Sequence, residues 1–127
     1  SKTELGINTS SRKPYDRNER VGDEIRQILA NCFISEIFIP EAGLLTVTKV
    51  KVTEDLKIAN IYLSFLENKL PVDEVIGIFI SKQNQIRYHM GNKLTLKFIP
   101  QLRFHYDDSI EHAQHIDSLL QKLHKDD

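Results

Sequence analysis

The segment LLTVTKVKVTEDLKIANIYLSFL, residues 44–66, decides the fold. Its two halves are rich in β-branched side chains, and the polar turn TEDLK at 53–57 separates them. Alternate positions of the second half are apolar, as in a strand with one buried face: Ala59, Ile61, Leu63 and Phe65. In the first half the apolar phase slips between Val47 and Val50, which predicts a β-bulge or a two-sided strand. We therefore expect an antiparallel hairpin.

A helix is predicted before this hairpin, over residues 17–35. Its apolar residues recur at the spacing of an amphipathic helix: Val21, Ile25, Ile28, Leu29, Cys32 and Phe33. Asp16 and Glu19 are placed as a capping box at its start. Cys32 is the only cysteine of the chain. It cannot form an internal disulfide or a thiolate metal cage, and we interpret it as a reduced core residue.

Helical spacing returns after the hairpin. Pro71 suits the first turn of a helix, and the following apolar residues have a helical period: Val72, Val75, Ile76, Phe79, Ile80, Ile86 and Met90. The polar run SKQN at 81–84 interrupts this pattern. It indicates two helices or one kinked helix, with Gly91 as a left-handed cap at the end.

A third strand is predicted from Leu94 to Tyr106. Leu94, Leu96 and Phe98 share one face, and after Pro100 the same phase resumes with Leu102, Phe104 and Tyr106 inward. Lys97, Arg103 and His105 then point outward. Proline cannot donate to a strand ladder, so Pro100 should lie at an edge or a break.

The remaining sequence completes the domain organisation. Asp108 and Glu111 form a possible capping box for a C-terminal helix. We expect a flexible arm at 1–15, one ordered domain at 16–124 and a flexible end at 125–127. The predicted order αββααβα is an α+β pattern with a small three-stranded sheet and helices packed on one face.

Charge is unevenly distributed along the 127 residues, although the formal net charge is only −1. Residues 75–106 contain five Lys/Arg and no carboxylate, whereas residues 107–127 contain two Lys/Arg and six carboxylates. A net charge near zero argues against bulk polyanion binding but allows a local basic face. Charge alone favours an ordinary solvated face.

Several functional classes have no support in the sequence. No apolar run is long enough for a membrane span, and the polar opening SKTELGINTSSRKPYDRN has no signal-peptide centre, so we expect a cytoplasmic protein without a membrane partner. No Gly-x-x-x-x-Gly-Lys-Ser/Thr loop is present to hold a nucleotide. His112 and His115 lack a third metal ligand, and a helix cap explains Asp107 and Asp108. We expect no enzyme activity, cofactor, metal or small-molecule substrate.

Four blocks of sequence carry a family resemblance: RNERVGDEI, TVTKVKVTEDLKIANIYLSFL, IRYHMGNKLTLKFIPQLRFHYDDSIE and IDSLL. Together they closely resemble the bacterial ribosome-binding factor A family over about residues 16–123. The element order resembles a type II KH-like domain with an αββααβ core and an added C-terminal helix. Such domains usually bind RNA.

The resemblance implies a ribosome assembly factor of late small-subunit maturation and rRNA processing, linked to cold adaptation. It implies binding to the small ribosomal subunit and to rRNA near its 5′-terminal helix, without catalysis, by a protein that is a monomer off the ribosome. An alternative is a KH-like protein-interaction module that reaches the ribosome through protein contacts.

Candidate RNA-binding residues combine this resemblance with the charge pattern: Arg17, Arg20, Lys82, Arg87, Lys93, Lys97 and Arg103. The family's Arg-x-x-Arg-Val element matches Arg17, Arg20 and Val21, although Arg20 is equally suited to pair with Glu24. Where the family has an Ala-x-Gly helix kink, this chain has Lys82, Gln83 and Asn84. Asn84 tolerates a left-handed backbone and could provide the bend.

Overall fold

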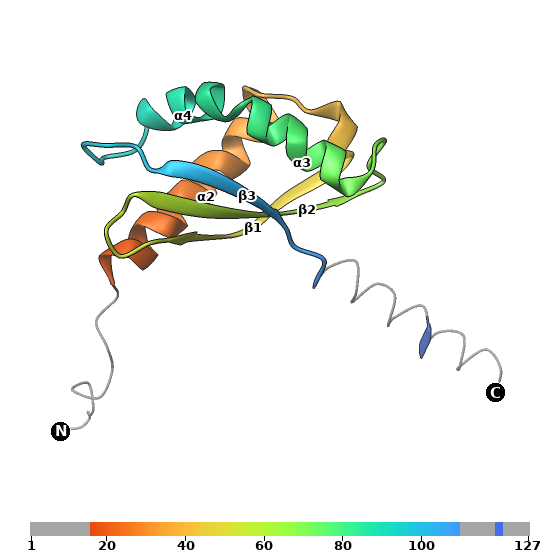
Figure 1. Ribbon diagram of the computed structural model, residues 1–127, viewed down its shortest axis with the longest axis horizontal. Coiled ribbons are helices and arrows are strands. Elements are labelled where there is room, and N and C mark those ends of the chain that lie inside the picture. The colour runs from red at the N-terminus through yellow and green to blue at the C-terminus, as the bar shows by residue number, and fades with distance from the viewer. Residues whose placement is uncertain (1–15, 110–118, 121–127) are drawn as a thin grey trace.

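A three-stranded sheet with helices on one face forms the part of the chain described by the computed structural model, residues 16–109 and 119–120 (Figure 1). The elements in chain order are α2 (Arg17–Ser35), a 3₁₀ turn (Pro40–Ala42), β1 (Leu44–Val52), β2 (Ile58–Leu66), α3 (Val72–Ser81), α4 (Gln83–Gly91) and β3 (Gln101–Tyr106). This αββααβ order is the predicted α+β, type II KH-like core.

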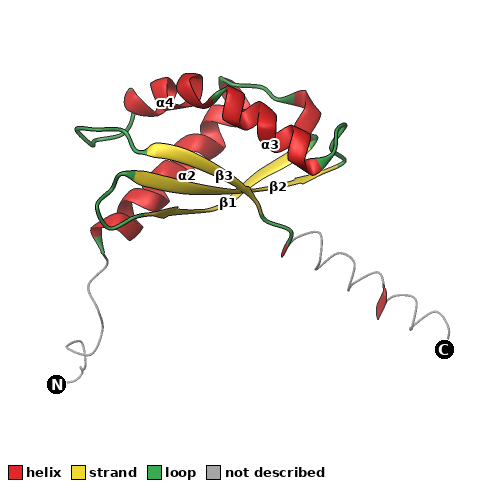
Figure 2. Ribbon diagram, in the orientation of Figure 1, coloured by secondary structure: helices red, strands yellow, loops and turns green. Residues whose placement is uncertain are grey.

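The sheet has the strand order β1-β2-β3 (Figure 2). β1 and β2 pair antiparallel, and their register shifts between Val47 and Lys49, so the predicted hairpin and bulge are both confirmed. β3 pairs parallel to β2, with Ile58 opposite Gln101. Because a parallel neighbour requires a crossover connection, α3 and α4 lie between the two strands in sequence.

The hydrophobic core lies between the sheet and the helices. The four alternating residues of β2 are all buried, and Phe79 of α3 contacts rings from two other elements. Its ring centroid is 5.4 Å from that of Phe33 and 5.7 Å from that of Phe104. Helix α2 lies very close to β1, because a Cβ added to Gly22 would be 2.6 Å from the carbonyl oxygen of Val50. Only glycine permits this approach.

The predicted start of α2 is confirmed. Asp16 and Glu19 form the capping box, and the backbone N–H of Asp16 donates to Oε1 of Glu19 at 3.3 Å. Cys32 is buried on the inner face of the helix, and burial raises the pKa of its thiol. The cysteine is therefore a core residue, as predicted.

The third strand is shorter than predicted, because β3 begins at Gln101 and not at Leu94. The register explains the difference. With Gln101 opposite Ile58, an extension back to 95–99 would need partners at 52–56, which already form the end of β1 and the turn. Leu94 is buried as predicted, but Phe98 is 77% exposed and does not face the core.

The break between α3 and α4 is at Lys82, with φ −99° and ψ 9°, and two helices result. The prediction of a left-handed residue here is wrong. Among the described non-glycine residues, Leu56 and Glu67 have positive φ, and Asn84 does not. Gly91 also lacks the positive φ predicted for it and is the last residue of α4.

The flexible arm predicted at 1–15, most of the predicted C-terminal helix and the end at 125–127 lie outside the described residues. Within the described part, the helices are too short or too polar to cross a membrane.

Candidate nucleic-acid interface

Arg87 of α4 is half-buried and serves the fold. Its Nε donates to the carbonyl oxygen of Pro100 at 3.2 Å, and its Nη2 donates to that of Ile99 at 2.9 Å. Arg87 is one of the predicted RNA-binding residues, and its guanidinium is engaged by the protein backbone. A guanidinium presents several donors in a fixed planar arrangement, which suits two successive carbonyls. Arg87 therefore fixes the backbone directly before β3.

Lys93 is exposed but paired. Its Nζ donates to Oε1 of Glu36, and Nδ1 of His89 lies 2.5 Å from Oε2 of the same carboxylate. The hydrogen bond from Lys93, followed by the charges of Lys93 and His89, lowers the pKa of Glu36, and the same bond raises the pKa of Lys93. Glu36, which is distant in sequence, thus offsets part of the positive charge of residues 75–106.

The junction between α3 and α4 is also held to the sheet. Oε1 of Gln83 accepts a hydrogen bond from the backbone N–H of Leu102 at 2.9 Å. The backbone N–H of Lys82 donates to the carbonyls of both Ile78 and Phe79 at 3.1 Å. Of the three proposed kink residues, Lys82 marks the break, and Gln83 connects it to β3. The half-buried Lys82 side chain makes no ion pair within the described part.

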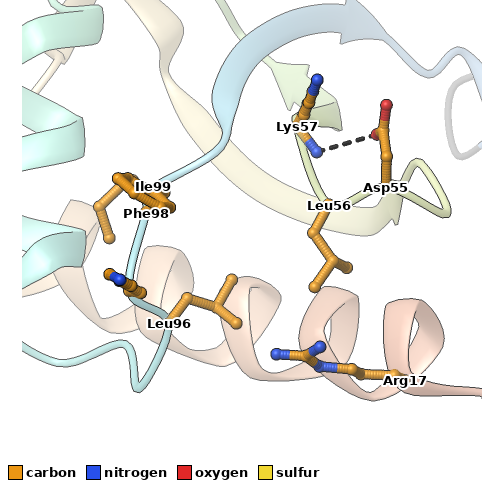
Figure 3. Close-up of a pocket in the computed structure, with 8 residues that line it drawn as sticks. Arg17, Asp55, Leu56, Lys57, Leu96, Phe98 and Ile99 are labelled. Atoms are coloured by element: carbon orange, nitrogen blue, oxygen red, sulfur yellow. Dashed lines mark hydrogen bonds between the residues drawn. The ribbon is translucent and has the colours of Figure 1, made fainter.

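A cleft of about 350 Å³ brings together two of the predicted cations, Arg17 and Lys97. Figure 3 shows the cleft in close-up, with Arg17 labelled. We call it the Phe98 cleft. It lies between the start of α2, the turn joining β1 to β2, and the loop before β3. Its lining residues are Arg17, Asp55, Leu56, Lys57, Leu96, Lys97, Phe98 and Ile99. Lys57 was not predicted as a site residue, because it lies in residues 36–74, which contain four Lys/Arg and seven carboxylates.

The turn that forms one wall of the cleft has a defined geometry. Oδ1 of Asp55 accepts hydrogen bonds from the Thr53 hydroxyl at 2.6 Å and from the backbone N–H of Lys57 at 3.1 Å. Both hydrogen bonds lower the pKa of Asp55, and the bond from Thr53 has the larger effect. Leu56 has φ 62°, a left-handed conformation uncommon for leucine, and its side chain lies inside the cleft in Figure 3.

The outer face of the sheet carries a second group of cations: Lys49, Lys51 and Arg103. The three strands contain no carboxylate. Lys51 and Arg103 flank Asn60 in one cross-strand row, and Lys49 and His105 flank Tyr62 in the next. We call these two rows the outer sheet face. Its lysines and Arg103 are exposed, and none forms an ion pair with a described residue.

Rings and amides on this face are held in place. The Tyr62 and His105 rings stack with centroids 5.0 Å apart and an interplanar angle of 26°. Nε2 of His105 lies 2.9 Å from Oδ1 of Asn60, within hydrogen-bond distance. Nζ of Lys49 lies 4.8 Å from the Tyr62 centroid, within cation–π range.

The structure divides the predicted cations into separate locations. Arg17 and Lys97 meet at the Phe98 cleft, and Arg103 is on the outer sheet face. Arg20 is exposed on α2 and makes no ion pair with Glu24 in the described structure. The other three lie on the helical side: Lys82 is between α3 and α4, Arg87 is on α4, and Lys93 follows α4. In the described part of the chain, no group of three or more His, Cys, Asp or Glu side chains could hold a metal.

Comparison with known proteins identifies the family. A sequence profile described as ribosome-binding factor A matches residues 17–120. Ribosome-binding factor A of Staphylococcus carnosus is 35% identical over 111 residues, covering 87% of this chain and 96% of that protein. The chain belongs to the ribosome-binding factor A family.

Structures of ribosome-binding factor A share the fold. The crystal structure of the Thermus thermophilus factor has a TM-score of 0.62 and 16% identity, and covers 70% of this chain and 94% of its own. A homology model of the Thermus thermophilus factor, as fitted into the cryo-EM map of a 30S complex, has a TM-score of 0.59 and 15% identity, and covers 72% of this chain and 96% of its own.

Proposed function

We propose that this chain is a ribosome assembly factor that binds the small ribosomal subunit and its rRNA during late maturation and rRNA processing. It stabilises one maturation conformer by binding alone, without catalysis, and supports growth in the cold. On this proposal it works in the cytoplasm and is a monomer off the ribosome. Membership of the ribosome-binding factor A family supports the proposal, as does the 30S complex of the Thermus thermophilus factor.

The observation that carries the RNA part of the proposal is a set of exposed cations that form no ion pair with a described carboxylate. Arg17, Lys57 and Lys97 surround the Phe98 cleft. The outer sheet face adds further cations at the three strands. Lys and Arg side chains bind RNA phosphates, and this binding releases the counterions that surround the phosphates.

Binding can favour one rRNA conformer only through a difference in affinity. A protein that binds two conformers equally leaves their ratio unchanged, however tightly it binds. The factor must therefore hold an immature or rearranged rRNA geometry more tightly than the mature one. Cations carried by separate elements of one folded domain suit this role, because phosphates that move apart lose contacts.

The test uses the Arg17→Gln/Lys97→Gln double variant and purified small subunits over a salt series. Removing two phosphate contacts should weaken binding and reduce the magnitude of the log-affinity against log-salt slope by roughly 1.4 to 1.8. A Lys69→Gln variant is the control, since Lys69 lines neither this cleft nor the groove between α2 and β1. An unchanged affinity and slope in a folded Arg17/Lys97 variant would exclude the cleft cations as phosphate contacts.

A second candidate function is the KH-like protein-interaction module, and one observation favours it. Ile34 and Phe38 are 83% and 78% exposed, and they line a groove of about 340 Å³ between α2 and β1. Exposed apolar side chains that gather at one place are typical of protein contacts. If the subunit is reached through this groove, its binding should depend weakly on salt and strongly on Ile34→Ser.

A further inference from the structure

We propose that the Phe98 cleft binds one unstacked nucleobase of single-stranded RNA, with the flanking phosphates held by Arg17, Lys57 and Lys97. This inference rests on the proposed RNA-binding function and specifies the ligand at one site. The cleft shares no lining residue with the junction of α3 and α4, where KH domains hold the nucleic-acid backbone.

The cleft offers apolar area to a base. Leu56, Leu96 and Ile99 are half-buried and line its interior. Phe98 is 77% exposed and forms no ring pair with another described aromatic residue, and Nζ of Lys97 lies 5.6 Å from its ring centroid. Single-stranded RNA is typically bound by stacking its bases on such rings. A volume of about 350 Å³ is at the small end of ligand pockets and suits one base better than a run of bases.

The charges around the cleft complement a phosphate backbone. Its three cations come from three separate segments: Arg17 from α2, Lys57 from the hairpin turn and Lys97 from the loop before β3. Asp55 is the one carboxylate among the lining residues, and two hydrogen bonds engage its Oδ1 within the turn. The lining therefore has a formal charge of +2, from three cations and one carboxylate.

The walls of the cleft are held before any ligand arrives. The left-handed backbone of Leu56 is one constraint, since such strained residues persist where surrounding structure enforces them and they cluster at ligand sites. On the opposite wall, Arg87 holds the carbonyl oxygens of Ile99 and Pro100. A preorganised cleft loses less conformational entropy when a base enters it.

Phe98→Ala is the decisive variant, because its exposed ring can be removed without opening the core. Phe38→Ala is the matched control, since Phe38 is 78% exposed and lies in a different groove. The probe is a single-stranded RNA of about 10 nucleotides, used intact and as an abasic oligonucleotide with the same phosphates. Fluorescence anisotropy measures both affinities, and thermal unfolding checks that each variant is folded.

We expect Phe98→Ala to weaken binding of the intact RNA roughly 5- to 100-fold, the range expected for loss of one stacked base. Its binding of the abasic RNA and the salt slope should stay unchanged. Phe38→Ala should leave both RNAs unaffected, and Phe98→Trp should restore binding of the intact RNA.

Two results would overturn the inference. Equal weakening for intact and abasic RNA would mean that Phe98 acts without a base. No weakening for either RNA would mean that the cleft binds no base, and if the same variant then bound the small subunit more weakly, the cleft would belong to a protein contact. Salt-dependent binding of wild-type protein to small subunits, measured in parallel, tests the proposed function separately, so that function can stand when the base site fails.

Discussion

The α4 side of the molecule and the Phe98 cleft both contain cations from residues 75–106, the segment without carboxylates, but these cations have different surroundings. Arg87 and Lys93 are engaged within the protein, one by backbone carbonyls and the other by Glu36. Lys97, four residues after Lys93, is exposed and makes no ion pair in the described structure, and its Nζ lies 5.6 Å from the ring centroid of the neighbouring Phe98. Cations that are neighbours in sequence therefore differ in the folded protein, because folding brings a partner to some of them and not to others.

The largest effect that would test this comparison is a loss of stability in Arg87→Gln. The substitution removes charged donors from two carbonyls beside β3, and we expect the free energy of unfolding to fall by about 2 kcal/mol. Urea denaturation monitored by circular dichroism measures the change. Arg20→Gln is the control, because Arg20 is exposed and should alter stability by less than about 0.5 kcal/mol. Equal stability of Arg87→Gln and Arg20→Gln would mean that the hydrogen bonds of Arg87 do not stabilise the fold.

The outer sheet face provides the next test, with an effect on binding and none on folding. Lys51→Gln/Arg103→Gln removes two exposed cations on either side of Asn60. If both contact phosphates, the salt slope for small-subunit binding should decrease in magnitude by roughly 1.4 to 1.8, with an unchanged unfolding midpoint. A slope equal to that of the wild type would confine the RNA contact to the cleft.

A smaller difference should separate two single variants from the same loop region. Lys97→Gln should reduce the magnitude of the salt slope by roughly 0.7 to 0.9, the value for one phosphate contact. Lys93→Gln should change it much less, because Lys93 is paired with Glu36. Titrations at matched salt concentrations compare them directly, and the opposite ranking would show that the Glu36 pair opens on the ribosome.

The smallest expected effect is a pH dependence of stability from Glu36. Its pKa is lowered in the folded protein from the ordinary value of 4.5, first by the hydrogen bond from Lys93. The stabilisation is therefore present above pH 4.5 and is lost as the pH falls through the lower folded value. The difference in unfolding midpoint between wild type and Glu36→Gln should shrink from pH 7 to pH 3.

Glu54→Gln is a suitable control for this measurement, because Glu54 is exposed and makes no ion pair within the described residues. A difference for Glu36→Gln that stays constant across the same pH range would mean that the carboxylate contributes through packing alone.

The local patterns of the sequence were sufficient to predict α2, the hairpin and its bulge, since spacing and capping residues determine these elements. The start of β3 could not be predicted in this way. Leu94 and Leu96 alternate like strand residues, but strand pairing depends on a register that leaves them no partner on β2. Pairing across the sheet therefore overruled the local pattern.

The candidate site was predicted less completely than the fold. Arg17 and Lys97 were identified from charge and family resemblance, yet Lys57 and the exposed Phe98 ring were missed. Phe98 had been assigned inward from its phase in a strand that does not form there. The roles of Arg87 and Gln83 depend on backbone groups 12 to 19 residues away, which no sequence pattern marks.

The parallel pairing of β2 with β3 also has a consequence for the nascent chain. Paired residues such as Ile58 and Gln101 are 43 positions apart, since 101 − 58 = 43. At about 5 to 20 residues per second, a translating ribosome needs roughly 2 to 9 seconds to add this length. During that interval the hairpin can form, but one edge of β2 has no partner, and unpaired edges favour aggregation. Slower translation would lengthen the period in which the half-made sheet is exposed.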